Sequence, residues 1–199
     1  MSRVVAIVGS YRRGGITDSA VDAVLEGART AGAETKKIYL MDRDIRFCRN
    51  CRKCTQAGGV ARGKCDQPDG LEGLLQEIES ADGLVLSSPV NYFNVTALFR
   101  QFMERLLGYM YWPWGSRLGP VLRAKRTTKR SVLVTSAAMP AWLIPLTTSA
   151  TRALKTTARM LGAKPVGKLW IGLVAKQPHE ELPMRARARA VRLGAKLAG

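Results

Sequence analysis

Histidine is almost absent from this sequence, which contains a single one, His179, among its 199 residues. It lies between Pro178 and Glu180, where we expect a surface turn. A mechanism that pairs a nucleophile with an imidazole base is therefore disfavoured, and so is a metal site built from several imidazoles.

Acidic side chains are scarce as well. Fifteen Asp and Glu residues stand against 32 Lys and Arg residues, which gives a formal net charge of +17 and a pI near 10.4. A surface this basic attracts nucleic acid, anionic lipid or phosphorylated small molecules. A nucleic-acid-binding role rests on this charge alone. The arginines of the last predicted helix are more typical of a solvated helical face: Arg185, Arg187, Arg189 and Arg192.

The sequence also lacks a long hydrophobic run. Its longest weakly polar stretch, residues 137–146, contains two prolines and falls far short of the roughly 20 residues that a membrane-spanning helix needs. The apolar run at the N-terminus, residues 4–8, is too short for the core of a signal peptide. We therefore expect a cytoplasmic protein with no membrane partner.

The N-terminal part of the sequence begins with a short apolar run, Val4–Val8. A loop rich in glycine and hydroxyl groups follows, and then apolar residues at helical spacing, which predicts a strand, a loop and a helix. A loop of this kind presents backbone N–H groups at the start of a helix, where the helix dipole favours an anion. The loop has neither the ending of a Walker motif nor the three-glycine dinucleotide pattern. An ordinary connection between a strand and a helix is the plain alternative.

Side chains in this loop favour a phosphate as the anion. Ser10 and Thr17 supply hydroxyl donors, and Arg12 and Arg13 supply positive charge. Charge-assisted hydrogen bonds from such groups are the strong ones. The sequence therefore predicts a phosphate site at this loop.

Apolar runs of strand length alternate with segments of helical periodicity along the chain. On the helix predicted over residues 97–109, we expect Arg100, Glu104 and Arg105 on the polar side. The other helices are predicted over residues 20–28, 69–81, 148–161 and 182–197. The strands are predicted at Val4–Val8, Lys36–Leu40, Gly83–Ser87, Val132–Thr135 and Val166–Val174.

This alternation predicts an α/β fold, with helices on both faces of a parallel sheet. Five strands suit a single flavodoxin-like domain over residues 1–199, a three-layer sandwich with strand order 2-1-3-4-5. Ligands of such sheets bind at the carboxyl ends of the strands. Three loops should gather there: the Ser10 loop, Pro89–Asn94 and Ser136–Pro140.

All four cysteines fall in one polar insertion at about residues 41–68, with the spacing Cys48-x2-Cys51-x2-Cys54-x10-Cys65. A compact triplet with an outlying fourth cysteine is typical of many iron-sulfur clusters. Zinc held by four thiolates and reduced free thiols stay open as alternatives. Neighbouring basic side chains would offset the negative charge of the thiolates: Arg46, Arg49, Arg52, Lys53, Arg62 and Lys64.

Several motifs together resemble the NADPH-dependent FMN reductase family of flavodoxin-like proteins. The resemblance covers residues 3–107 by motif and the remainder only by the pattern of elements. The iron-sulfur flavoprotein branch is the closer likeness, because three cysteines fall between the second strand and the second helix. The motifs are Gly9-Ser10-x-Arg12, Gly15-x-Thr17, Ser88-Pro89-Val90-x-Tyr92 and Ala97-x-x-Arg100-x-Phe102-x-x-Arg105.

The resemblance implies non-covalently bound FMN and NAD(P)H as co-substrate. Hydride would pass to the flavin and then to a flavin, quinone or other small acceptor. The iron-sulfur branch implies a 4Fe-4S cluster and an electron-transfer protein as partner, although its last cysteine gap is shorter than the one here. Family members often form dimers or tetramers, so a homo-oligomer is expected. Few protein groups need act as acid or base in this chemistry, and we name no catalytic residue.

The resemblance also assigns residues to the flavin site. The sequence departs from the family pattern at Tyr11, where proline is common, and at Ile16, where a polar residue is usual. At Ile16 only the backbone N–H can bind the phosphate. The phosphate positions are Ser10, Arg12, Gly15, Ile16 and Thr17; those along the flavin ring are Pro89, Val90, Asn91, Tyr92 and Phe93; Ser136 and Ala137 belong to the third loop.

Overall fold

The computed structural model describes residues 1–123, 127–174 and 180–199, so His179 lies outside the described residues. Its main sheet has five parallel strands in the order β2-β1-β3-β6-β7. In order of their appearance along the chain this is 2-1-3-4-5, which confirms the predicted flavodoxin-like order. Within the described part of the chain, no helix is both long and apolar enough to cross a membrane.

The main strands are β1 (Arg3–Val8), β2 (Glu34–Tyr39), β3 (Gly83–Pro89), β6 (Lys129–Ser136) and β7 (Ala163–Ile171). A separate hairpin pairs β4 (Met110–Tyr111) with β5 (Val121–Leu122). The α-helices are α1 (Ile16–Thr30), α2 (Leu71–Glu79), α3 (Ala97–Glu104), α4 (Ile144–Thr147), α5 (Ala150–Met160) and α6 (Met184–Ala198). The 3₁₀ helices are η1 (Leu40–Asp42), η2 (Lys53–Thr55), η3 (Arg105–Tyr109) and η4 (Ala141–Leu143).

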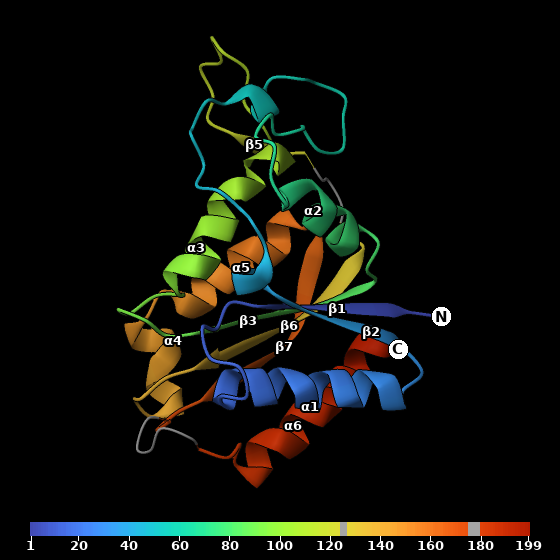
Figure 1. Cartoon of the computed structure of the whole chain (residues 1–199), viewed down its shortest axis with the longest axis vertical. Coiled ribbons are helices and arrows are strands. Elements are labelled where there is room, and N and C mark those ends of the chain that lie inside the picture. Colours follow the sequence, from blue (N-terminus) through green and yellow to red (C-terminus); the bar gives the residue numbers. More distant parts are fainter. Residues whose placement is uncertain (124–126, 175–179) are drawn as a thin grey trace.

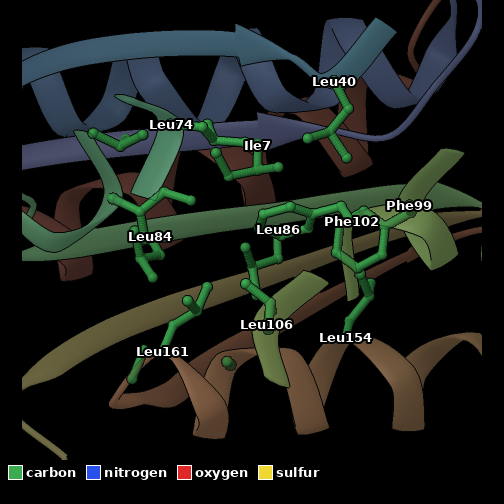
Figure 2. Packing of buried hydrophobic residues seen from close by; sticks show 14 of the residues in the cluster. Ile7, Leu40, Leu74, Leu84, Leu86, Phe99, Phe102, Leu106, Leu154 and Leu161 are labelled. Carbon is green, nitrogen blue, oxygen red and sulfur yellow. The ribbon is translucent and has the colours of Figure 1, made fainter. Parts of the chain in front are cut away.

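Helices cover both faces of the sheet: α2, α3 and α5 on one, α1 and α6 on the other (Figure 1). Successive residues of β1 therefore enter different cores, with Val5 and Ile7 on the α3 side and Val4 on the α1 side. Figure 2 shows Ile7 and Leu86 facing the phenylalanines of α3, Phe99 and Phe102. Burial on both faces explains why these strands are continuous apolar runs.

Helices α1 and α6 cross at close range because glycines lie at the crossing. A Cβ atom on Gly27 would overlap the backbone carbonyl of Val191. A Cβ atom on Gly194 would likewise overlap the carbonyl of Val24. The C-terminal helix is thereby held against the helix that follows the glycine loop.

One expectation about the third predicted helix is wrong. The helix predicted over residues 97–109 ends at Glu104 and continues as the tighter helix η3. The change from 3.6 to about three residues per turn rotates the following side chains. Arg105, expected on the polar side with Arg100 and Glu104, is buried instead, with 1% of its side chain exposed.

The cysteine-bearing segment, residues 41–68, folds back onto η3 and the β4–β5 hairpin, beyond α2 and α3 in Figure 1. The Gly63 N–H donates to the Gly108 carbonyl at 2.8 Å, and the Trp112 N–H donates to the Thr55 carbonyl at 3.0 Å. The Arg52 guanidinium lies between two indole rings, 3.5 Å from the centroid of Trp112 and 4.0 Å from that of Trp114. The segment is thus tied to the hairpin by backbone bonds and a stacked cation.

Candidate functional site

A cavity of about 440 Å³ opens at the carboxyl ends of the strands, where the sequence predicted the three loops to meet. The first loop contributes Ser10, Tyr11, Arg12, Gly15, Ile16 and Thr17. The second and third contribute Pro89, Val90, Asn91, Ser136, Ala137 and Ala138, and Val174 and Glu180 complete the lining.

Hydroxyl groups join the three loops to one another. Thr17 Oγ1 lies 2.6 Å from Ser136 Oγ, which links the first loop to the third. Thr96 Oγ1 donates to the Gly9 carbonyl at 2.7 Å, and the Thr96 N–H donates to Ser88 Oγ at 3.0 Å. These groups are buried, so the bonds between them fix the positions of the loops relative to one another.

One end of the cavity suits an anion. Helix α1 begins after Gly15 without a side-chain cap, so the N–H groups of its first turn have no intrahelical acceptor. The hydroxyls of Ser10 and Thr17 lie in the cavity wall with only 5% and 4% of each residue exposed, and Arg12 adds a guanidinium. Hydroxyls, free N–H groups and a cation at a helix start are the donor set that a phosphate needs.

Arg13 does not share this role with Arg12. Its guanidinium is turned to the other side of the loop, where it pairs with Asp42 at 2.5 Å and stacks on Tyr39 at 4.4 Å. Arg13 is also absent from the lining of the cavity. Of the two adjacent arginines, only Arg12 faces the anion end.

The second predicted loop is brought to the cavity only in part. Pro89, Val90 and Asn91 line it, whereas Tyr92 and Phe93 do not. Those two aromatic residues lie at the tip of the loop with positive φ angles, and 98% and 61% of their surfaces are exposed. The structure therefore places Pro89–Asn91, and not the two rings, along the cavity.

Four lining residues were not among the predicted site residues. Tyr11 extends from the first loop, and its hydroxyl accepts the N–H of Leu98 at 3.0 Å, at the start of α3. Ala138 belongs to the third loop, just beyond the predicted Ala137. Val174 and Glu180 come from the segment between β7 and α6. Nothing local in the sequence marks these last two, because only the tertiary fold brings Val174 and Glu180 to the cavity.

The four cysteines form a second chemical feature, away from this cavity. Cys48, Cys54 and Cys65 are half-buried and Cys51 is exposed, and none forms a disulfide. Their identity suits a cluster or a zinc ion. In residues 1–123, 127–174 and 180–199, however, no three His, Cys, Asp or Glu side chains are placed to hold a metal ion. The donor set fits a metal site, whereas this arrangement of the side chains does not form one.

Burial and the nearby thiols of Cys65, Cys48 and Cys51 raise the pKa of Cys54 to about 11. Because the thiolate is the reactive form, alkylation of Cys54 in metal-free folded protein should rise about tenfold per pH unit and level off only above about pH 11. In urea it should level off near the ordinary thiol pKa of about 8.5. Trypsin cuts after Lys53 and Arg62, so mass spectrometry of residues 54–62 follows this cysteine alone. Equal midpoints in folded and unfolded protein would contradict the prediction.

Comparison with known proteins agrees with this geometry. Residues 2–173 match the sequence model of the family described as NADPH-dependent FMN reductase. An iron-sulfur flavoprotein of Archaeoglobus fulgidus is 34% identical over 123 residues, 62% of this chain and 50% of that protein. One of Methanocaldococcus jannaschii is 33% identical over 103 residues, 52% of this chain and 51% of that protein. The chain thus spans about half the length of the curated relatives it matches.

Solved structures show the same fold at low identity. An FMN-dependent NADH-azoreductase of Bacillus anthracis, in complex with FMN, has a TM-score of 0.72 at 14% identity, with 100% of both chains covered. An NAD(P)H:quinone oxidoreductase of Methanothermobacter marburgensis has a TM-score of 0.71 at 20% identity, covering 100% of this chain and 98% of that one. Because the family match extends over most of the sequence, this protein belongs to the NADPH-dependent FMN reductase family.

Proposed function

We propose that the protein is an FMN-dependent NAD(P)H oxidoreductase that passes electrons to a flavin, a quinone or another small acceptor. The observation that carries the proposal is the cavity at the sheet edge, which is lined both by the phosphate donors of the first loop and by the Pro89–Asn91 loop. Membership of the family supports the same cofactor.

The chain's own residues would bind and orient rather than transfer protons. Ser10, Arg12 and Thr17 would hold the phosphate together with the N–H groups of the first turn of α1. The loop Pro89–Asn91 and Ser136 would fix the plane of the ring. Bound FMN would accept hydride from a nicotinamide and pass the electrons on, a chemistry that belongs to the cofactor. The protein then contributes position and a phosphate anchor.

Spectroscopy of gently purified protein tests this proposal. We expect flavin absorption bands, or their appearance with quenched fluorescence when FMN is added to colourless protein. Loaded protein should then oxidise NADPH or NADH when free flavin or a quinone is supplied. Protein that neither contains nor takes up FMN would overturn the proposal. The cytoplasmic location and the homo-oligomeric state stay predictions.

A second candidate function is favoured by the cysteines. As an iron-sulfur flavoprotein, the protein would pass electrons to a protein partner, and the matched curated relatives carry that name. The half-buried thiols of Cys48, Cys54 and Cys65 beside one exposed thiol support this candidate. Iron and acid-labile sulfide in anaerobically isolated protein would favour it. Zinc, or four titratable thiols without metal, would favour the oxidoreductase alone.

A further inference from the structure

The turn before α1 is held by a carboxylate that does not line the cavity. Gly14 has a left-handed φ of +68°, and its N–H donates to Asp18 Oδ2 at 2.7 Å. Asp18 lies in the first turn of α1, with 3% of its side chain exposed. The bond therefore connects the turn at residues 12–15 to the first turn of α1. The N–H groups of this first turn are those that would bind a phosphate.

A buried negative charge at this place would repel a phosphate unless something cancelled it. Both Asp18 oxygens accept the Tyr39 hydroxyl, at 3.0 Å each. Lys37 Nζ lies 2.6 Å from Asp18 Oδ1. Burial lowers the pKa of Lys37, but hydrogen bonds to Asp18 and Asp22 outweigh it and hold this pKa above its ordinary value. Lys37 therefore remains charged, and Asp18 does not line the cavity.

We propose that Asp18 is a positioning residue for the phosphate of FMN, and that Lys37 makes this role compatible with an anionic ligand. Asp18 fixes the turn at Gly14 so that the donors of residues 10–17 converge on one point. Lys37 pairs with Asp18 and offsets its charge, and neither residue lines the cavity. The inference rests on the proposed function, because it assumes FMN as the ligand.

A plainer role for Asp18 would be to stabilise α1, because acidic residues in the first turn interact favourably with the helix dipole. That role predicts a lower free energy of unfolding and an equal effect on every ligand of the cavity. The positioning role predicts an effect confined to ligands that carry the phosphate. Riboflavin separates the two, since it has the ring and the ribityl chain of FMN but no phosphate.

Asp22 provides a matched control. Its carboxylate also lies 2.6 Å from Lys37 Nζ, but 59% of its side chain is exposed. In fluorescence titrations we expect Asp18→Ala to weaken FMN binding about 10- to 100-fold, the range for losing a hydrogen bond to a charged group. We expect Asp22→Ala to leave FMN affinity within about threefold and neither variant to change riboflavin affinity.

A double-mutant cycle tests the charge of Lys37. Lys37→Met leaves Asp18 uncompensated and should weaken FMN binding about tenfold or more, with riboflavin binding unchanged. Asp18→Asn removes the charge but keeps an oxygen for the Gly14 N–H. The double variant Asp18→Asn with Lys37→Met should therefore recover FMN affinity to within about threefold of the wild type.

The outcomes distinguish FMN binding by the protein from the role of Asp18 in that binding. Wild-type protein that binds no FMN would refute the proposed function itself. Wild-type protein that binds FMN, with Asp18→Ala no weaker than Asp22→Ala, would overturn only the role of Asp18. Equal losses for FMN and riboflavin would assign Asp18 to helix stability, and the lack of recovery in the double variant would overturn the role of Lys37.

Discussion

Replacing Arg105 with glutamine should lower the free energy of unfolding by about 3–5 kcal/mol, because it leaves a buried carboxylate without its cation. Arg105 Nη1 lies 2.5 Å from Asp69 Oδ2, and the exposed fractions of the two side chains are 1% and 0%. The same guanidinium donates to the Arg46 carbonyl at 2.6 Å and contacts Cys65 Sγ at 3.4 Å. Urea denaturation of both proteins measures the difference.

Arg100 is the control for this substitution. It belongs to the same helical segment and pairs with Glu104 at 3.4 Å, but both side chains are about half exposed. Arg100→Gln should change the free energy of unfolding by no more than about 0.5 kcal/mol. Losses of equal size for the two variants would show that the buried pair carries no special stability.

The pH dependence gives an independent check. Burial raises the pKa of Asp69, but the hydrogen bonds from Arg105 and from nearby backbone N–H groups outweigh it and hold this pKa below its ordinary value. In the wild type this stabilisation is present above the unfolded pKa of about 3.9 and is lost as the pH falls through the folded value. Without Arg105, burial is opposed only by the backbone N–H groups of Arg46 and Leu71, so the Asp69 pKa is higher in the variant than in the wild type. The gap between the two proteins should therefore be smaller near pH 4 than near pH 7.

Arg105 also shows which part of the fold could not be predicted from the sequence. The five strands and their order could be predicted, because segments of strand length alternate with segments of helical periodicity, which is typical of a parallel sheet covered by helices. The face of Arg105 could not, because helical spacing from Ala97 onward places it beside Arg100 and Glu104. The chain continues as a 3₁₀ helix from Arg105, and the Arg105 side chain contacts Arg46 and Cys65, which lie far away in sequence.

Some residues of the candidate site could be predicted from the sequence and others could not. Ser10, Arg12 and Thr17 could be predicted, because glycines, hydroxyls and a helix start are adjacent in the chain. The different orientation of Arg13 could not, because its partners lie far along the chain: Tyr39 ends β2 and Asp42 follows it. The compensation of Asp18 by Lys37 was hidden for the same reason, since β2 meets α1 only in the folded chain. Local motifs thus predicted the donors of the site, and the tertiary structure supplies the residues that orient them.

Removing the two donors that the sequence marked should have the largest effect on ligand binding. In the double variant Arg12→Ala with Thr17→Ala, FMN affinity should fall by about 100-fold or more, because two hydrogen bonds to a charged phosphate are lost. Thr17 also bonds Ser136 at 2.6 Å, so its loss frees the third loop as well. Fluorescence titration with FMN and with riboflavin measures both contributions. The loss for riboflavin should be much smaller and reports the loop alone.

Arg13→Ala is the control for charge, since it removes one cation from the same loop without touching the cavity. If the site recognises phosphate by placed donors, this variant should retain FMN affinity within about threefold. If the net charge of +17 were instead the main attraction, Arg13→Ala and Arg12→Ala would weaken binding alike, and added salt would abolish it. Equal effects of the two arginines would therefore place the phosphate elsewhere. A loss confined to Arg12 and Thr17 would place it at the start of α1.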